Sequence, residues 1–314
     1  MRTKRTGIVT CTICAIVLLS LVSCVHRPFA DEYYFQAMGE PQDIVVTMDM
    51  QRIDRLPGAS ALTHSEDPSF AQLLSRIDRL SVTLYNPAAL ELTDDVIDMQ
   101  DIDSYEFYGG VEGNIPAFLT NSMLLWNDDW EKVEEGRVRY YRNDWLGLDV
   151  YAPQRGLLLF ASDNYMKVYQ DTYKHRVTRI QRGLADRMAN ALFGFYIASP
   201  QAMIDVGLAI PQTVLAQMES MVLVIEEHDD QTLSLGGVLT MHTPKLANSL
   251  SILLKSSYIS EKRRNREPLG DLTNLFILEE AAVHINGMSL SEEQYATFSE
   301  LFGSLTTITT GEKR

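Results

Sequence analysis

The feature that most constrains the fold is an order of predicted elements that occurs twice along the chain. Each copy contains a β-rich segment with the sequence Gly-Gly-Val, at Gly109–Val111 and again at Gly236–Val238. A proline follows each motif after a short loop, Pro116 in the first copy and Pro244 in the second, and begins a helical pattern. Connecting loops tolerate small differences in length. The agreement of element order on both sides of the motif predicts an internal duplication.

The duplication predicts an α+β fold built from two similar α/β halves, residues 43–172 and 193–314. We expect mostly antiparallel or mixed sheets covered by amphipathic helices, because each half must bury one face of its sheet. Residues 173–192 are expected to form a connecting basic amphipathic helix. Two such halves either enclose a ligand cleft between them or simply enlarge the core, and the sequence leaves both arrangements open.

Local patterns predict the individual elements. Runs rich in β-branched and aromatic residues predict strands at residues 43–49, 82–85, 105–113, 138–141, 148–151, 157–161, 193–197, 221–226, 232–241, 275–279 and 281–285. Apolar spacings of three and four predict helices at residues 70–80, 116–126, 165–192, 201–218, 244–254 and 291–302, with a break at Pro211.

The N-terminus has the pattern of a secretory signal peptide over residues 1–23. Arg2, Lys4 and Arg5 precede an uncharged run that is apolar from Ile13 to Val22. A transmembrane helix is the alternative, but it needs about 20 apolar residues, and this run is shorter.

The segment Leu21-Val22-Ser23-Cys24 at the end of this run resembles the lipobox of bacterial lipoproteins. The resemblance implies that Cys24 receives a diacylglycerol, that the chain is cut before it, and that the new N-terminus gains a further acyl chain such as palmitate. Residues 24–42 would then be the acylated cysteine and a tether. Cys11 and Cys14 would leave with the signal peptide, so the mature chain could form no disulfide within itself.

The same resemblance implies a place in the cell envelope, at the periplasmic face or the surface. In many two-membrane bacteria an aspartate after the cysteine retains a lipoprotein at the inner membrane, and Val25 stands there. We therefore expect the outer membrane rather than the inner one. The predicted architecture, taken with the lipobox, also resembles treponemal outer-membrane lipoproteins built from two α/β halves with amphipathic helices. No diagnostic motif supports that resemblance, so no binding residues are carried over.

The charge of the chain indicates which classes of binding partner to expect. The chain has 42 acidic and 27 basic residues, a net charge of −15, which argues against nucleic-acid binding. Against this acidic background two basic clusters are candidates for binding a membrane or an anion, one on the predicted connecting helix and one in a predicted loop: Lys174, Arg176, Arg179, Arg182 and Arg187, and Lys262, Arg263, Arg264 and Arg266. The alternative is an ordinary surface helix whose arginines pair with acidic residues of the protein.

Motifs for catalysis or metal binding are weak. No metal-ligand spacing of histidines and no Gly-x-Ser-x-Gly turn occurs, so we expect neither a metal nor a cofactor. His228-Asp229-Asp230 follows a predicted strand and is read as a tight turn rather than a catalytic group. The acidic run 94–103 is read as a solvated loop rather than a calcium site, because it lacks the glycine and final glutamate of a calcium loop.

The leading expectation is a non-enzymatic, membrane-anchored lipoprotein whose body binds lipid or a small apolar ligand. Two alternatives remain open at this point. One is a structural or assembly subunit that binds other envelope proteins, and the other is a hydrolase with an unrecognised site. Enzyme activity is ranked last because no nucleophile and base can be paired from spacing alone.

Overall fold

The computed structural model describes residues 44–55, 75–85, 106–136, 138–162, 182–198, 212–228 and 232–290. The predicted signal peptide, Cys24, the tether, the acidic run and the predicted helix 291–302 lie outside these residues, as do Lys174, Arg176 and Arg179. The described residues form an α+β fold dominated by one sheet of 12 strands, in which neighbouring strands are antiparallel throughout.

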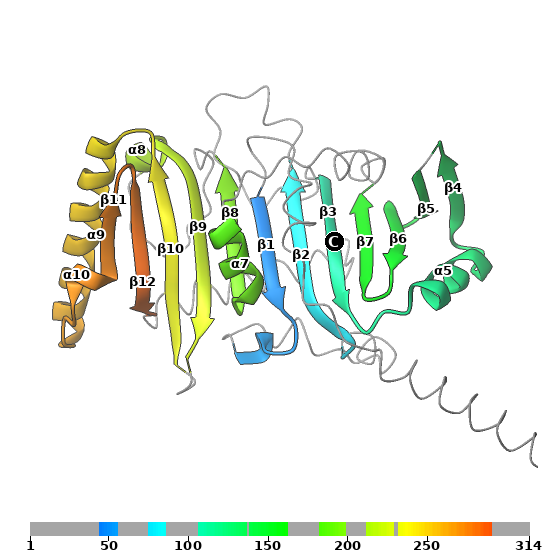
Figure 1. The fold of residues 1–314 in the computed structure, drawn as a ribbon, viewed down its shortest axis with the longest axis horizontal. Helices are drawn as coiled ribbons and strands as arrows, with labels where there is room; N and C mark the ends of the chain where they lie inside the picture. The colour runs from blue at the N-terminus through cyan, green and yellow to red at the C-terminus, as the bar shows by residue number, and fades with distance from the viewer. Residues whose placement is uncertain are drawn as a thin grey trace, which may run out of the picture.

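The strands follow the order β11-β12-β10-β9-β8-β1-β2-β3-β7-β6-β5-β4 across the sheet (Figure 1). Their bounds are β1 Ile44–Asp49, β2 Ile77–Tyr85, β3 Glu106–Gly113, β4 Glu131–Glu135, β5 Val138–Asn143, β6 Leu148–Gln154, β7 Leu157–Ser162, β8 Phe193–Ala198, β9 Met218–Glu227, β10 Leu233–Met241, β11 Phe276–Glu279 and β12 Ala282–Ser289. The helices are η2 Ile53–Arg55, α5 Ala117–Trp126, α7 Arg182–Asn190, α8 Gln212–Leu215, α9 Pro244–Asn265 and α10 Leu272–Leu275.

The strand order is similar on the two sides of the boundary between β1 and β8. Reading outward, one side runs β1-β2-β3-β7-β6 and the other runs β8-β9-β10-β12-β11. On each side three strands in chain order are followed by the last strand of that half and then by the strand before it. The Gly-Gly-Val motifs lie in β3 and β10, the third strand outward on each side. Since β1 and β8 pair antiparallel, the two halves join edge to edge into one continuous sheet.

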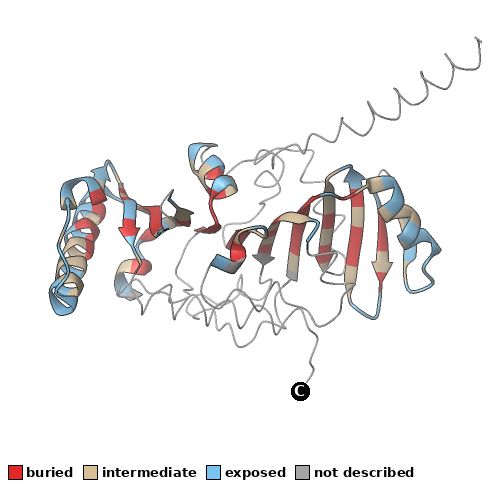
Figure 2. Cartoon of the chain, turned by 90° about the horizontal axis from the view of Figure 1, so that it is seen from below, coloured by how far each residue is buried: buried red, intermediate tan, exposed pale blue. Residues whose placement is uncertain are grey.

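Helices cover both faces of the second half. The larger core cluster joins β1, β8, β9, β10 and β12 to α8 and α9, and includes Leu223, Leu250 and Ile285. On the opposite face α7 packs Ala185 and Met188 on Val222 and Val224. Figure 2 shows the buried positions concentrated along the strands, whereas the helix at the right-hand end, α5, is exposed or half-buried.

A smaller cluster lies in the first half. Tyr108, Tyr140 and Leu159 pack together there on β3, β5 and β7. At the sheet edge, β4 exposes four charged side chains out of five residues. Charged residues on an edge strand discourage pairing with another chain. Neither β4 nor the short helix α10 was predicted from the sequence.

Three predicted elements differ from the structure. Ile77 and Leu80, expected at the end of a helix, lie in β2. Leu80 and Val82 are two residues apart, so they share one face of this strand, and both pair with β1. The predicted helix 201–218 is helical over Gln212–Leu215 among its described residues, and Met218 already begins β9. The cluster Lys262–Arg266 is not a loop: α9 continues to Asn265, since its residues after Leu254 have good helix propensity and meet no breaker.

Both Gly-Gly-Val motifs allow close approach of a neighbouring strand, as glycines within strands often do. A Cβ on Gly109 would lie 2.3 Å from the carbonyl oxygen of Ser81, and one on Gly237 would lie 2.3 Å from that of Val222. The second motif also lies at an irregularity, because the β10–β12 register shifts between Leu235 and Gly237.

Candidate functional site

The most unusual surface of the described chain is helix α5. None of its ten residues is buried. Phe118 is 81% exposed, Met123 73% and Trp126 85%, and Leu119 and Leu125 are more than half exposed. At 100° per residue these five side chains span an arc of about 160° on the helix. An apolar face of this size is normally turned toward the core of a protein.

The opposite side of α5 is held to the sheet by a polar contact. The Asn121 amide donates to the Ala152 carbonyl at 2.8 Å, and its side-chain oxygen accepts from the Ala152 N–H at 3.1 Å. Ala152 lies in β6 beyond the last residue that pairs with β5, so Asn121 occupies backbone groups that a further strand would otherwise use. The helix is therefore docked through Asn121 and presents Phe118, Met123 and Trp126 outward.

Helix α5 also lacks the usual terminal stabilisation. Its N-cap is Pro116, which makes no side-chain capping bond, and the first turn contains no acid and the last turn no base. Each such cap or charge typically stabilises a helix by about 0.5–2 kcal/mol. The helix is thus specified mainly by Pro116 and by the helix-forming residues that follow.

A second exposed apolar pair lies in the turn between β5 and β6. Trp145 is 90% exposed and Leu146 is 52% exposed. The turn is fixed by Asn143, whose side-chain oxygen accepts from the Leu146 N–H at 2.9 Å, and by Gly147 at φ +59°. All three tryptophans of the chain, at positions 126, 130 and 145, fall in this region. Tryptophan is enriched where proteins meet the interface of a membrane.

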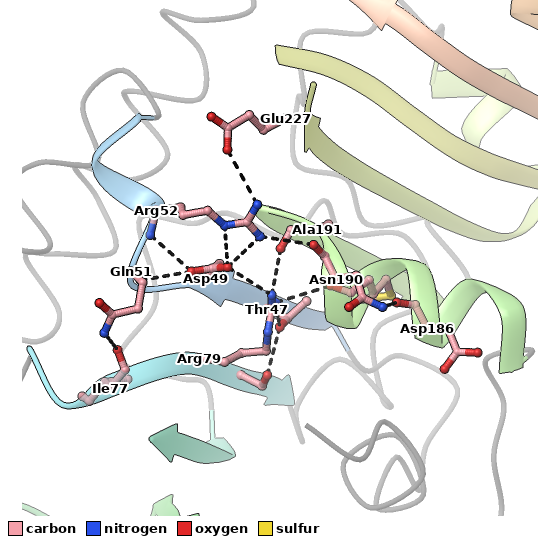
Figure 3. A network of polar contacts seen from close by, with 12 residues as sticks. Thr47, Asp49, Gln51, Arg52, Ile77, Arg79, Asp186, Asn190, Ala191 and Glu227 are labelled. Atoms are coloured by element: carbon pink, nitrogen blue, oxygen red, sulfur yellow. Dashed lines mark hydrogen bonds and ion pairs between the residues drawn. The ribbon is translucent and has the colours of Figure 1, made fainter. Parts of the chain in front are cut away.

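A polar network joins the two halves at their boundary (Figure 3). Arg79 of β2 donates to the carbonyl of Ala191 at 2.9 Å and to Thr47 Oγ1 at 3.0 Å, and so caps the end of α7. A cation at the C-terminus of a helix is stabilising. Arg52 binds Asp49 through Nε at 2.8 Å, and Arg55 forms an ion pair with Glu227 of β9. We interpret this network as structural, because its charges are satisfied within the protein.

Six of the nine basic residues predicted as membrane or anion contacts lie among the described residues: Arg182 and Arg187 in α7, and Lys262, Arg263, Arg264 and Arg266 at the end of α9. Arg187 makes a two-pronged ion pair with Glu226, both contacts at 2.7 Å, and this hydrogen bonding raises the pKa of Arg187. Gly236 leaves the room that its guanidinium fills. Arg187 thus pairs with an acid of the protein, as the alternative interpretation expects, and its role as a membrane or anion contact stays a prediction. Arg182 is the first residue of α7.

The second basic cluster ends helix α9. Lys262 pairs with Glu267, which raises the pKa of the lysine, and its ammonium lies 5.4 Å from the centre of the Tyr258 ring. Arg263 and Arg264 are exposed in the last turn, and Arg266 forms the left-handed C-cap at φ 58°. Basic residues at this position stabilise the helix end. The cluster thus has a structural role, and α9 lies at the other end of the sheet from α5 (Figure 1).

Of the predicted turn His228-Asp229-Asp230, only His228 lies among the described residues. The His228 N–H donates to the Thr232 carbonyl at 2.9 Å, and His228 Nε2 lies 2.7 Å from Ser234 Oγ. A serine and a histidine at this distance could form a nucleophile and base. Ser234 is only 4% exposed, however, so a substrate has no direct access to its hydroxyl. Asp229 and Asp230 lie outside the described residues.

Two buried acids distinguish the first half. Asp149 is fully buried and receives two hydrogen bonds from Arg142, at 2.8 and 2.9 Å. Glu112 is 8% exposed, and burial raises its pKa to about 8, aided by nearby Asp78 and opposed by the attraction of Arg79. Neither acid was singled out by the sequence analysis. Asp149 sits in a strand with no motif around it, and Glu112 directly follows the Gly-Gly-Val motif, which was used only for its glycines and its place in the element order.

The sequence analysis predicted α5 as a helix but not its orientation. The signal that could have been used is the combination of Phe118, Met123 and Trp126 with the polar Thr120 and Asn121 on the other side of the helix. The spacing of apolar residues indicates that a helix has apolar side chains on one face. It does not indicate whether that face packs on the protein core or lies at the surface.

No described helix has the length and apolar character needed to cross a bilayer. No group of three or more His, Cys, Asp and Glu side chains in the described part of the chain is arranged to hold a metal ion.

Comparison with known proteins yields a likeness of fold. No family model and no curated protein sequence matches the chain. Crystal form I of TP0453 superposes with a TM-score of 0.51 at 14% identity, covering 88% of this chain and 97% of that one. Crystal form IV gives 0.51 and 14%, covering 85% and 96%. TP0453 is a treponemal outer-membrane lipoprotein. The resemblance expected from the sequence is therefore shown at the level of the fold.

Proposed function

We propose that this protein is a non-enzymatic envelope lipoprotein, anchored through Cys24, whose body binds a lipid surface through α5. The observation that carries the proposal is the outward apolar face of α5, formed by residues that average well over half exposed. Scattered exposed apolar residues are normal, but a contiguous apolar face marks a binding surface for lipid or protein. The fold shared with TP0453 and the lipobox favour lipid.

The energetics suit reversible binding. Full burial of one large apolar side chain contributes roughly 1.5–3 kcal/mol. Five such side chains on α5, with Trp145 nearby, are enough for a lipid contact that adds to the acyl anchor. An apolar face of this kind would lie in the plane of the interface, since α5 has only 10 residues and spans no bilayer.

The test uses the chain from Val25 to Arg314, which retains every described residue and lacks the acylation site. We expect it to float with liposomes and its tryptophan emission to shift to the blue, because Trp126 and Trp145 would leave water. Ser substitutions at Phe118, Met123 and Trp126 should abolish flotation. Ile252 of α9 is also exposed, at 61%, so Ile252→Ser is the matched control and should leave binding unchanged.

A chain that stays in solution with every liposome would refute the lipid-binding body and leave the acyl anchor as the only link. The anchor is tested separately by labelling cells with a radioactive fatty acid. The native protein should be labelled and a Cys24→Ser variant should not. Fractionation of the envelope then tests the proposed outer-membrane location.

The internal duplication is part of the same proposal. It is supported by the matching strand order on the two sides of the β1–β8 boundary and by the Gly-Gly-Val motif in β3 and β10. On this view α5 and α9 are equivalent helices, each beginning after the motif strand and a proline. One copy has kept the role of a core helix, and the other has become the exposed lipid contact.

A further inference from the structure

We infer that the lipid surface bound by α5 carries uncharged or zwitterionic headgroups, and that anionic lipid is disfavoured. This inference rests on the proposed function and specifies its lipid class. It follows from the charges that surround the apolar face rather than from the apolar face itself.

The helix contributes no charge to the contact. Residues 117–126 contain no ionisable side chain, so nothing on α5 attracts an anionic headgroup. Membrane-surface helices that select anionic lipid carry lysine and arginine on their polar face. The polar side of α5 instead uses Asn121 to bind β6.

The rim next to the helix is acidic. Asp128 and Asp129 follow Trp126 directly after Asn127, and Glu131 begins the edge strand β4; all three side chains are exposed. Of the described cations at this end of the sheet, Lys132 and Arg139 bind the carboxylate of Glu134, at 2.7 and 3.0 Å, and Arg142 binds Asp149 at 2.8 Å. The exposed Arg155 lies in the β6–β7 turn, whose Gly156 bonds Ile115, so it stands beside the start of α5 and at the opposite end of the helix from Trp126. When Trp126 enters a headgroup layer, these acidic side chains come within a few ångströms of the headgroups.

The basic end of α9 cannot compensate. Helix α9 packs on β10, β11 and β12, whereas α5 packs on β6. Seven strand steps separate β10 from β6 in the sheet order, which at about 4.8 Å per step is roughly 35 Å. That exceeds the Debye length of about 10 Å at 0.1 M salt, the low-salt condition of the test below, so Arg263 and Arg266 do not screen the acidic rim there.

An anionic surface therefore repels the site while a neutral one does not. Each charge near an anionic membrane changes the binding constant by about fivefold. With Asp128, Asp129 and Glu131 at the rim, binding to anionic vesicles should be weaker by at least about tenfold at low salt.

The experiment compares vesicles of phosphatidylcholine alone with vesicles that also contain phosphatidylglycerol. Binding of the Val25–Arg314 chain is followed by tryptophan emission at low and high salt. We expect binding to phosphatidylcholine that is independent of salt, and binding to the anionic vesicles that is weak at low salt and recovers at high salt. Asp128→Asn with Asp129→Asn and Glu131→Gln should restore anionic binding and leave phosphatidylcholine binding unchanged. Arg263→Gln with Arg266→Gln is the matched control and should change neither.

Other outcomes separate this inference from the proposed function. Stronger binding to anionic vesicles that is lost in the Arg263→Gln, Arg266→Gln variant would overturn the inference, place the lipid contact at α9 and leave lipid binding intact. Absence of binding to either vesicle would overturn the proposed function as well. Self-association that disappears on Trp126→Ser would assign the face to a second copy of the chain and overturn both.

Discussion

The two halves of the sheet have a similar order of five strands but differ in how the helix after the Gly-Gly-Val strand is packed. In the second half the motif strand β10 leads to α9, a 22-residue helix that buries Ala247, Leu250 and Leu254. In the first half the motif strand β3 leads to α5, which buries nothing. The comparison shows that a shared framework does not determine which way a helix turns its apolar side.

The helix starts explain part of the difference. Helix α9 begins with Thr243, whose hydroxyl accepts from the Leu246 N–H, and ends with a left-handed C-cap. Helix α5 begins without a side-chain cap and is less than half as long. Most helical stability in proteins comes from packing an apolar face. Because α5 lacks caps and such packing, its attachment depends on Asn121 and on the covalent connection to β3.

The interiors differ as well. The buried polar residues of the first half include Arg79, Glu112 and Asp149, all charged types, whereas those of the second half are Ser234 and Ser251 among the residues described. A buried charge is stable only when it is paired and hydrogen-bonded. The second half therefore depends on apolar packing, and the first half depends on a few specific polar contacts.

The largest expected effect is the loss of a polar contact in the first half. Arg142→Ala should destabilise the protein by about 3–5 kcal/mol, because it leaves the fully buried Asp149 without its ion pair. Chemical denaturation measures the change. Arg139→Ala on the same strand is the control, and it should cost less than about 1 kcal/mol because the Arg139–Glu134 pair is exposed. Equal effects of the two variants would contradict the contrast between the halves.

The comparison of α9 with α5 predicts a somewhat smaller difference in the free energy of unfolding. Leu250→Ala in α9 should cost about 3 kcal/mol, since Leu250 is 1% exposed and its removal leaves a cavity. Leu119→Ala in α5 should change the free energy of unfolding by less than about 0.5 kcal/mol, because Leu119 is 56% exposed. A large loss at Leu119 would mean that α5 packs on the body, and its role as a free lipid contact would be refuted.

The buried acid of the first half predicts a dependence on pH. The pKa of Glu112 is raised to about 8 in the folded protein, so the folded state binds its proton more tightly than the unfolded state. The native protein should therefore lose stability as pH rises from about 4.5 to about 8. One pKa unit corresponds to about 1.4 kcal/mol, which we take as the minimum loss.

Glu112→Gln isolates this effect. The variant should lack that part of the decline and be more stable than the native protein at pH 9, with a smaller difference at pH 5. Thermal unfolding at both pH values measures it. Arg79 and Asp78 are the charged neighbours that set the pKa, and both remain in the variant. A variant that is less stable than the native protein at pH 9 would show that the carboxylate is stabilised by Arg79 instead.

Much of the fold could be predicted from the sequence. The β-rich runs of β9 and β10, the helix after Pro244 and the Gly-Gly-Val segments in strands all follow from local patterns, and these elements are present. Elements with an ambiguous pattern could not be predicted: Arg79 and Ser81 are polar but buried, so β2 did not read as a strand throughout.

The candidate site could be predicted only in part. The helix 116–126 was identified, but its outward face depends on what the sheet offers it, and β6 offers free backbone groups rather than an apolar surface. The basic clusters were identified by composition, and composition cannot reveal that Glu226 and Glu267 lie beside Arg187 and Lys262. Such pairings depend on contacts between residues of different elements or turns.

The smallest expected effect is the loss of stability on replacing a glycine in the second copy of the Gly-Gly-Val motif, compared with the loss in the first copy. Gly236→Ala would bring a Cβ to 2.1 Å from Arg187 Nη2, which is the far end of a flexible side chain. Arg187 can move away at the cost of its half-exposed pair with Glu226, so we expect a loss of less than about 1 kcal/mol. Gly109→Ala would instead meet the Ser81 carbonyl and the Phe160 ring, and the resulting overpacking should cost about 1–3 kcal/mol. Denaturation of both variants tests this order, and the reverse order would mean that Arg187, rather than the strand backbone, is the rigid neighbour of the motif.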